Sequence, residues 1–284
     1  MNKSDLCALL SQLELHPSRK LGQNFLLDTN LLEAMLRDAV PRAGEEILEI
    51  GPGTGILTER LLAAGAQVTA IELDHRLAEY LQEKYRHCSN FRLLQGDACK
   101  MDYDALFASR PYRCLANLPY SCGSVFLAEI STAANPPREM YVLLQKEMGE
   151  RLTATAGSKD YGLLTVRLAW RYRIKILRTI APEVFFPPPD VWSAYLQFQL
   201  REPQPESELC VLASRLAVCA FSQRRKKALK LLQSLYDPAQ LSAAYAALGL
   251  SPEARAEEWS PEVFLSLAGI LSALSAPTIR KDDV

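Results

Sequence analysis

Short, mostly apolar runs separated by amphipathic stretches fill the chain from residue 47 to residue 144. Five runs are typical of buried strands: 47–50, 68–71, 91–94, 112–116 and 140–144. Helical periodicity lies between several of them, at 56–64, 75–85 and 125–132. This alternation indicates an α/β protein with a doubly wound parallel sheet. Two later runs, 174–180 and 192–198, are expected to extend the sheet at one edge and to include an antiparallel strand.

The pattern changes at residues 201–206, a polar and proline-rich stretch without apolar periodicity, where we place a linker. Beyond it the periodic segments are helical: 209–220, 227–235, 239–248 and 261–274. We therefore expect an α/β domain at residues 1–202 and a small all-α domain at residues 207–284.

The composition is that of an ordinary soluble protein. Of 284 residues, 49% are hydrophobic and 23% are charged, which excludes a disordered or fibrous chain. The longest apolar stretches are far shorter than the ~20 residues of a membrane helix, and the N-terminus has no secretory pattern. We therefore expect a cytoplasmic protein without membrane contact. Seven cysteines and three histidines show no metal-ligand spacing, so no metal site is expected.

The net charge of −1 conceals local basic segments. Residues 138–178 hold nine basic and four acidic side chains. A second basic run consists of Arg224, Arg225, Lys226 and Lys227. Such clusters are typical of contacts with nucleic-acid phosphates, because each cation releases counterions on binding. The alternative for the second run is a solvated helix face.

Three glycines follow the first strand, at the edge where doubly wound sheets bind ligands. Gly51, Gly53 and Gly55 allow a nucleoside to approach the backbone closely, although a simple tight turn is the alternative. Their spacing differs from the dinucleotide fingerprint, which makes nicotinamide binding the weaker interpretation. Glu72 ends the next strand, where a carboxylate can accept bonds from both ribose hydroxyls. Asp97 follows the third strand and can accept from an adenine amine.

The segment Asn117-Leu118-Pro119-Tyr120 directly follows the fourth strand. It is compatible with an ordinary turn. Its chemistry also favours a catalytic role. The Asn117 amide oxygen and the Pro119 carbonyl can accept both hydrogens of a planar amine, while Tyr120 stacks on the ring. Phe185, beside three prolines, is a candidate second aromatic face for an extruded base, although plain packing is the commoner role of such a residue.

Together these segments resemble the KsgA-type ribosomal RNA adenine dimethyltransferases, and the resemblance covers nearly the whole chain. It is carried by ordered motifs at 22–26, 49–55, 71–74, 96–98, 117–120, 145–147, 158–162, 185–191, 221–226 and 255–258. The resemblance implies a Rossmann-like methyltransferase sheet with a C-terminal helical RNA-binding domain, and S-adenosylmethionine as cofactor. It also implies that the cofactor site comprises Asn24, Leu26, Gly51, Gly53, Glu72, Asp97 and Asn117.

The resemblance further implies a substrate. Two adjacent adenosines in a hairpin loop near the 3' end of small-subunit ribosomal RNA would each be dimethylated, in the assembling 30S-type subunit. A monomer suits so large a substrate. Two positions depart from the family's usual residues: Leu21 stands where phenylalanine is common, and Trp192 where aspartate is common.

Two alternatives remain at this point. The related family that methylates large-subunit, 23S-type RNA and confers antibiotic resistance shares the architecture, but it typically has isoleucine at the position of Leu118 and lysine at that of Thr54. A catalytically silent RNA-binding assembly factor is the other alternative. The presence of all four expected site residues speaks against it: Asn117, Pro119, Tyr120 and Glu72.

Overall fold

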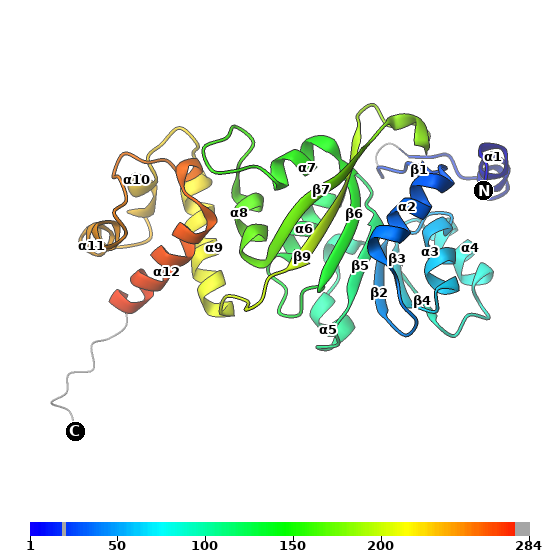
Figure 1. Ribbon diagram of the computed structural model, residues 1–284, viewed down its shortest axis with the longest axis horizontal. Coiled ribbons are helices and arrows are strands. Elements are labelled where there is room, and N and C mark those ends of the chain that lie inside the picture. Colours follow the sequence, from blue (N-terminus) through cyan, green and yellow to red (C-terminus); the bar gives the residue numbers. More distant parts are fainter. Residues whose placement is uncertain (19–20, 276–284) are drawn as a thin grey trace, which may run out of the picture. The chain divides into compact units, whose positions relative to one another are not determined.

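The structure is a computed structural model that describes residues 1–18 and 21–275 (Figure 1). Its chain forms two compact units. One comprises Met1–Thr153 and Tyr172–Leu200, and the other comprises Ala154–Arg171 and the chain from Arg201 onward. The sequence-based division between residues 202 and 207 placed 154–171 in the first domain, whereas the structure groups this segment with the second unit. Residues 276–284 of the expected helical domain lie outside the described residues.

A seven-stranded sheet forms the centre of the first unit, in the order β4-β3-β2-β5-β6-β9-β7. Its strands are β2 (Glu46–Ile50), β3 (Gln67–Glu72), β4 (Phe91–Gln95), β5 (Arg113–Asn117), β6 (Glu139–Gln145), β7 (Tyr172–Ile180) and β9 (Ser193–Leu200). The strands β2 to β6 pair in parallel, and β9 pairs antiparallel with both β6 and β7. This arrangement confirms the expected α/β sheet and its antiparallel addition at one edge.

Helices cover both faces of this sheet (Figure 1). In the view shown, α2, α3 and α4 lie in front of the strands and α6 lies behind them. The helices of the first unit are α1 (Lys3–Gln12), α2 (Thr29–Ala39), α3 (Ile56–Ala63), α4 (His75–Lys84), α5 (Tyr103–Phe107), α6 (Gly123–Ile130) and α7 (Lys146–Leu152). Leu32 and Leu61 from the front helices pack with Ile47 in one buried cluster. Apolar strands covered on both faces are the physical reason that the sequence shows near-continuous apolar runs.

A two-stranded ribbon ties the N-terminal segment to the proline-rich loop. β1 (Phe25–Leu26) pairs antiparallel with β8 (Phe185–Phe186), and Leu26 and Phe185 are partners in the register. Both side chains are buried in the same cluster as the front helices. Two-residue strands carry no readable periodicity, so the sequence did not predict them.

The second unit is helical. It contains α8 (Leu163–Arg171), α9 (Ser207–Phe221), α10 (Ala228–Leu232), α11 (Pro238–Leu248) and α12 (Pro261–Ser275). The Tyr161 hydroxyl donates to the Trp259 carbonyl at 2.8 Å, and the Trp170 ring N–H donates to the Pro261 carbonyl at 2.7 Å. These buried bonds explain why residues 154–171 belong to this unit.

Val40 has a backbone conformation that is unusual for its residue type. It ends α2 in the left-handed region, with φ 45° and ψ 64°, and its side chain is exposed. A β-branched residue is strained there, whereas glycine is favoured. We expect Val40→Gly to raise the free energy of unfolding by about 1 kcal/mol. Urea unfolding measures this change, and a Val40→Gly protein less stable than the wild type would contradict the assigned backbone conformation.

Candidate active site

The glycine loop after β2 has a backbone that other residues rarely adopt. Gly51, Gly53 and Gly55 all have positive φ, at 62°, 60° and 79°. The space around all three is also restricted, and a Cβ on Gly55 would lie 2.8 Å from a Leu81 side-chain carbon. A Cβ on Gly51 would lie 2.8 Å from a Pro119 side-chain carbon, and one on Gly53 would lie 3.2 Å from the Phe25 ring. Glycine is therefore required both by conformation and by the close approach of neighbouring segments.

Glu72 holds this loop from the end of β3. Its side chain is buried, and its two oxygens accept the Gly53 N–H at 3.1 Å and the Asp74 N–H at 3.0 Å. Burial raises the pKa of the Glu72 carboxyl above its ordinary value. Each carboxylate oxygen has a second lone pair. Glu72 can therefore shape the glycine loop and still accept hydrogen bonds from a ligand.

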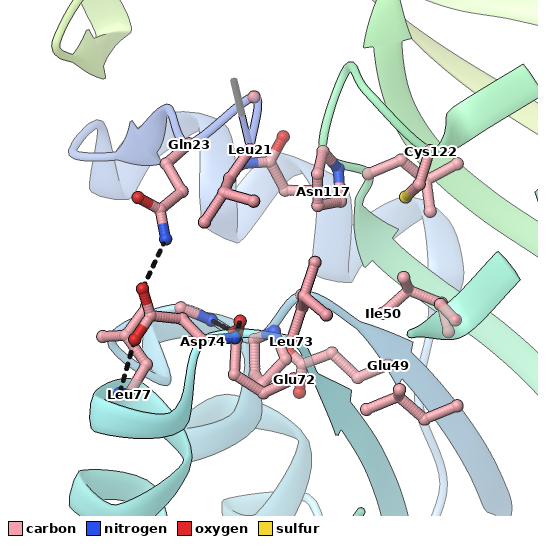
Figure 2. A pocket seen from close by; sticks show the side chains of 18 of the residues that line it. Leu21, Gln23, Glu49, Ile50, Glu72, Leu73, Asp74, Leu77, Asn117 and Cys122 are labelled. Carbon is pink, nitrogen blue, oxygen red and sulfur yellow. Dashed lines mark hydrogen bonds between the residues drawn. The ribbon is translucent and has the colours of Figure 1, made fainter. Parts of the chain in front are cut away.

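These residues line a cavity above the strand ends, here called the first cavity (Figure 2). Figure 2 shows Asn117 on one side of it and Glu72 on the other. Every residue that the sequence assigned to the cofactor site lines this cavity: Asn24, Leu26, Gly51, Gly53, Glu72, Asp97 and Asn117. The parallel strands end at the same edge of the sheet, which brings these distant residues together.

The Asn117 amide is held by the N-terminal segment. Its Nδ2 donates to the Asn24 carbonyl at 3.0 Å. Because that bond uses the amide nitrogen, it fixes the orientation of the side chain and leaves the Oδ1 atom as the acceptor. Asn24 thus acts through its backbone, a role that its side-chain chemistry alone could not have indicated.

Gln23 and Glu49 line this cavity and were not predicted as site residues. Gln23 donates from Nε2 to Asp74 at 3.3 Å, a bond that links the N-terminal segment to α4 and is drawn in Figure 2. Glu49 is buried and accepts from the Thr58 hydroxyl at 2.7 Å. Burial raises the pKa of Glu49 to about 8, so this carboxyl is mostly protonated at neutral pH. The sequence signal that could have identified Glu49 is its position as a charged residue within the apolar run 47–50.

Tyr120 borders both the first cavity and a neighbouring second cavity. The second cavity is lined by Gly22, Gln23, Asn24, Tyr120, Ser121, Gln145, Pro187, Pro188, Pro189, Asp190 and Val191. The Tyr120 hydroxyl bonds to the buried Ser193 hydroxyl. Burial raises the pKa of Tyr120, so its phenol stays neutral and offers an uncharged ring face. The cavities share the wall formed by Gly22–Asn24 and Tyr120–Ser121, so ligands in them would lie side by side.

The structure argues against the expected roles of Pro119 and Phe185. The Pro119 carbonyl accepts the N–H groups of Cys122 and Gly123, at 3.0 and 3.2 Å, where the chain turns into α6. A carbonyl has two lone pairs, and both are used here, which argues against the expected use of the Pro119 carbonyl as an acceptor for substrate.

Phe185 has only 3% of its surface exposed and is absent from the lining of both cavities. Its pairing with Leu26 in β1–β8 places the ring in the core and argues against a stacking role.

The second basic run lies in the helical unit, and its four side chains are exposed. Arg224 donates to the carbonyls of Lys159 and Tyr161, at 2.6 and 3.1 Å. Lys227 pairs with Glu253. Within the described part of the chain, the side chains of Arg225 and Lys226 make no hydrogen bond or ion pair. Arg224 therefore orders a loop, while Arg225 and Lys226 are the cations open to an external anion.

The basic residues at 138–178 belong partly to one unit and partly to the other. Arg171 is buried and Arg178 pairs with Asp38, so neither is open to an external anion. Over residues 1–18 and 21–275, no helix is long and apolar enough to cross a membrane. The same residues contain no group of three or more His, Cys, Asp or Glu side chains arranged to hold a metal ion.

The chain is similar to known proteins over nearly its whole length. The sequence model of a family described as ribosomal RNA adenine dimethylase matches residues 16–273. A protein of Pseudomonas putida named ribosomal RNA small subunit methyltransferase A is 38% identical over 260 residues, which cover 90% of this chain and 96% of the relative. The protein of the same name from Synechococcus elongatus is 36% identical and covers 92% and 97% of the two chains.

Solved structures share the fold. A dimethyladenosine transferase from Plasmodium falciparum superposes with a TM-score of 0.69 at 22% identity, over 86% of this chain and 95% of that one. The 23S rRNA methyltransferase ErmE superposes with a TM-score of 0.65 at 24% identity, over 88% of this chain and 100% of that one. At less than 25% identity, these two structures show the shared fold alone.

Proposed function

Because this chain belongs to the ribosomal RNA adenine dimethylase family, we propose that it uses S-adenosylmethionine to dimethylate two adjacent adenosines near the 3' end of small-subunit, 16S-type ribosomal RNA. We further propose that it acts as a monomer on the assembling 30S-type subunit, in the cytoplasm. The observation that carries this proposal is that a fixed amide acceptor, Asn117, and a buried carboxylate, Glu72, line one cavity beside a second cavity bordered by Tyr120.

The first cavity fits the methyl donor. When bound, S-adenosylmethionine supplies an electrophilic methyl group on a sulfonium centre. The side-chain-free backbone of Gly51 and Gly53 allows a nucleoside to lie close to the loop. We place the ribose hydroxyls on the Glu72 carboxylate, whose oxygens can each accept more than one hydrogen bond. Asp97 accepts from the Cys99 N–H at 3.0 Å through one oxygen, and we assign its other oxygen to the adenine amine of the donor.

The second cavity fits the target base. An adenine amine is a poor nucleophile because its lone pair is delocalised into the ring, so orientation has to compensate. Acceptors on both N–H bonds favour a pyramidal nitrogen whose lone pair points at the methyl group. Asn117 Oδ1 is one acceptor. We place the other at the carbonyl of Leu118, a lining residue of the first cavity, because the Pro119 carbonyl is already engaged.

The neutral ring of Tyr120 supports the extruded base by stacking. A strong base from the chain is not required, because the nitrogen becomes acidic once it carries the new methyl group and a positive charge. Its proton passes to solvent. Positioning by Asn117 and Tyr120 is then the main contribution of the protein to the rate.

The relatives favour a small-subunit target over a large-subunit one, since the similar sequences cited above carry the small-subunit name. The experiment is methylation of undermethylated small ribosomal subunits against naked large-subunit RNA. We expect transfer to the former. Transfer confined to large-subunit RNA would support the resistance-type alternative, and transfer to neither would support a silent assembly factor.

Arg225 and Lys226 provide a test of RNA binding. We expect the double replacement by alanine to weaken binding to small-subunit RNA and to reduce the slope of log affinity against log salt by about 1.5, because two phosphate contacts are lost. Titrations at several salt concentrations measure the slope. Arg92→Ala, an exposed arginine on β4, is the matched control. An unchanged slope in the double variant would remove these residues from the interface.

A further inference from the structure

Trp192 is exposed beside the second cavity. Its exposed fraction is 51%, whereas Trp170 and Trp259 are exposed by 5% and 4%. Val191 next to it is 44% exposed. Two consecutive exposed apolar residues, the first of them lining a cavity, are apolar surface of the kind that interaction sites use.

Both sequence neighbours of Trp192 contact the second cavity or its wall. Val191 lines this cavity, and the Ser193 hydroxyl bonds to the Tyr120 hydroxyl. The backbone between them is fixed, since the Trp192 carbonyl accepts the Lys146 N–H at 2.9 Å. Three prolines precede this segment and restrict its backbone. The backbone of the tryptophan is thus fixed directly after a residue that lines the cavity.

Lys146, whose N–H bonds to the Trp192 carbonyl, does not favour a phosphate contact at this point, because its ammonium group forms an ion pair with Glu150 at 3.3 Å. What the surface offers is an uncharged aromatic face. Every nucleobase has a complementary face, and stacking on aromatic side chains is the usual way in which unpaired bases are held.

We propose that Trp192 stacks on the unpaired base that neighbours the extruded adenosine. This inference rests on the proposed function, because it requires an RNA loop at the second cavity. It assigns a substrate-positioning role to a residue outside both cavities. Two adjacent targets make such a support useful, since the waiting adenosine is held while its neighbour is modified.

The test compares wild type, Trp192→Ala, Trp192→Phe and Val40→Ala. Val40 is a matched exposed apolar residue. It ends α2 and precedes β2, so it lies toward the amino ends of the strands, away from the cavities at their carboxyl ends. The substrates are undermethylated small ribosomal subunits and a synthetic RNA hairpin with two adjacent adenosines in its loop. We expect Trp192→Ala to raise KM about tenfold, as for the loss of one stacked base, with kcat retained within about twofold. Trp192→Phe should recover most of the loss, and Val40→Ala should match the wild type.

Two further readouts separate this role from others. The KM ratio should not change with salt, in contrast to that of the Arg225 and Lys226 variant. The hairpin should quench the tryptophan fluorescence of the wild type but not that of Trp192→Phe, because the other two tryptophans are buried.

An unchanged KM in Trp192→Ala, or equal quenching in wild type and Trp192→Phe, would overturn the inference. A raised KM on ribosomal subunits but not on the hairpin would also overturn it and point to a protein partner in the particle. Methyl transfer by the wild type tests the proposed function separately, so failure of the two can be distinguished.

Discussion

Replacing Asn117 with alanine should lower the rate of methyl transfer by about two to three orders of magnitude, the usual cost of removing one preorganised hydrogen-bonding group from a transition state. The variant loses the Oδ1 acceptor that orients the target amine. Its affinity for RNA should stay close to that of the wild type, because the phosphate contacts lie elsewhere. Single-turnover transfer from radiolabelled S-adenosylmethionine measures the rate, and RNA titration measures the affinity.

Asn117→Asp refines this test. The carboxylate keeps an acceptor but cannot donate to the Asn24 carbonyl, so its orientation is lost. We expect activity between those of the wild type and the alanine variant. Asn90→Ala, which removes a side chain bonded to the Ala66 carbonyl, is the matched control and should retain activity. Full turnover in Asn117→Ala would refute the role assigned to this amide.

Replacing Glu72 with alanine should weaken the binding of S-adenosylmethionine by about 100-fold. The variant loses charge-assisted hydrogen bonds to the ligand, each worth about 1.5 to 3 kcal/mol. It also loses the acceptors that hold the Gly53 and Asp74 N–H groups, so the glycine loop is less well ordered. Equilibrium dialysis with labelled donor measures the affinity.

Thermal unfolding gives an independent readout of this second prediction. A ligand that binds only the folded state raises its stability in proportion to the logarithm of its concentration over Kd. The donor should therefore raise the Tm of the wild type and of Glu79→Ala, an exposed control on α4, by the same amount. The shift should nearly vanish in Glu72→Ala. An equal shift in all three proteins would contradict the placement of the donor at Glu72.

The sheet and the carboxyl-end residues were predictable from the sequence for one physical reason. Strands buried on both faces have to be apolar, so a polar residue where such a run ends marks the ligand-binding edge. Glu72 and Asn117 meet this condition. Asp97 follows β4, whose residues are exposed or only partly buried, so it was predicted from its place after the third strand. Asn24 was reached only through the family resemblance, because it contributes a backbone carbonyl and because β1 is too short to show a period.

Other features depended on long-range packing that no local pattern encodes. Phe185 and Tyr120 are both aromatic residues beside prolines, yet only the pairing of β1 with β8 determines which ring is buried. The Pro119 carbonyl is engaged because the chain turns after it into α6, which begins at Gly123. The sequence predicts that Arg224 binds phosphate. In the fold, its guanidinium instead donates to the carbonyls of Lys159 and Tyr161.

The most direct test of the central claim is mass spectrometry of small-subunit RNA after incubation of undermethylated small ribosomal subunits with this protein and isotopically labelled S-adenosylmethionine. Nuclease fragments from the 3' end should contain two neighbouring adenosines, each carrying two labelled methyl groups. Fragments without label, or label confined to another base or to large-subunit RNA, would contradict the account.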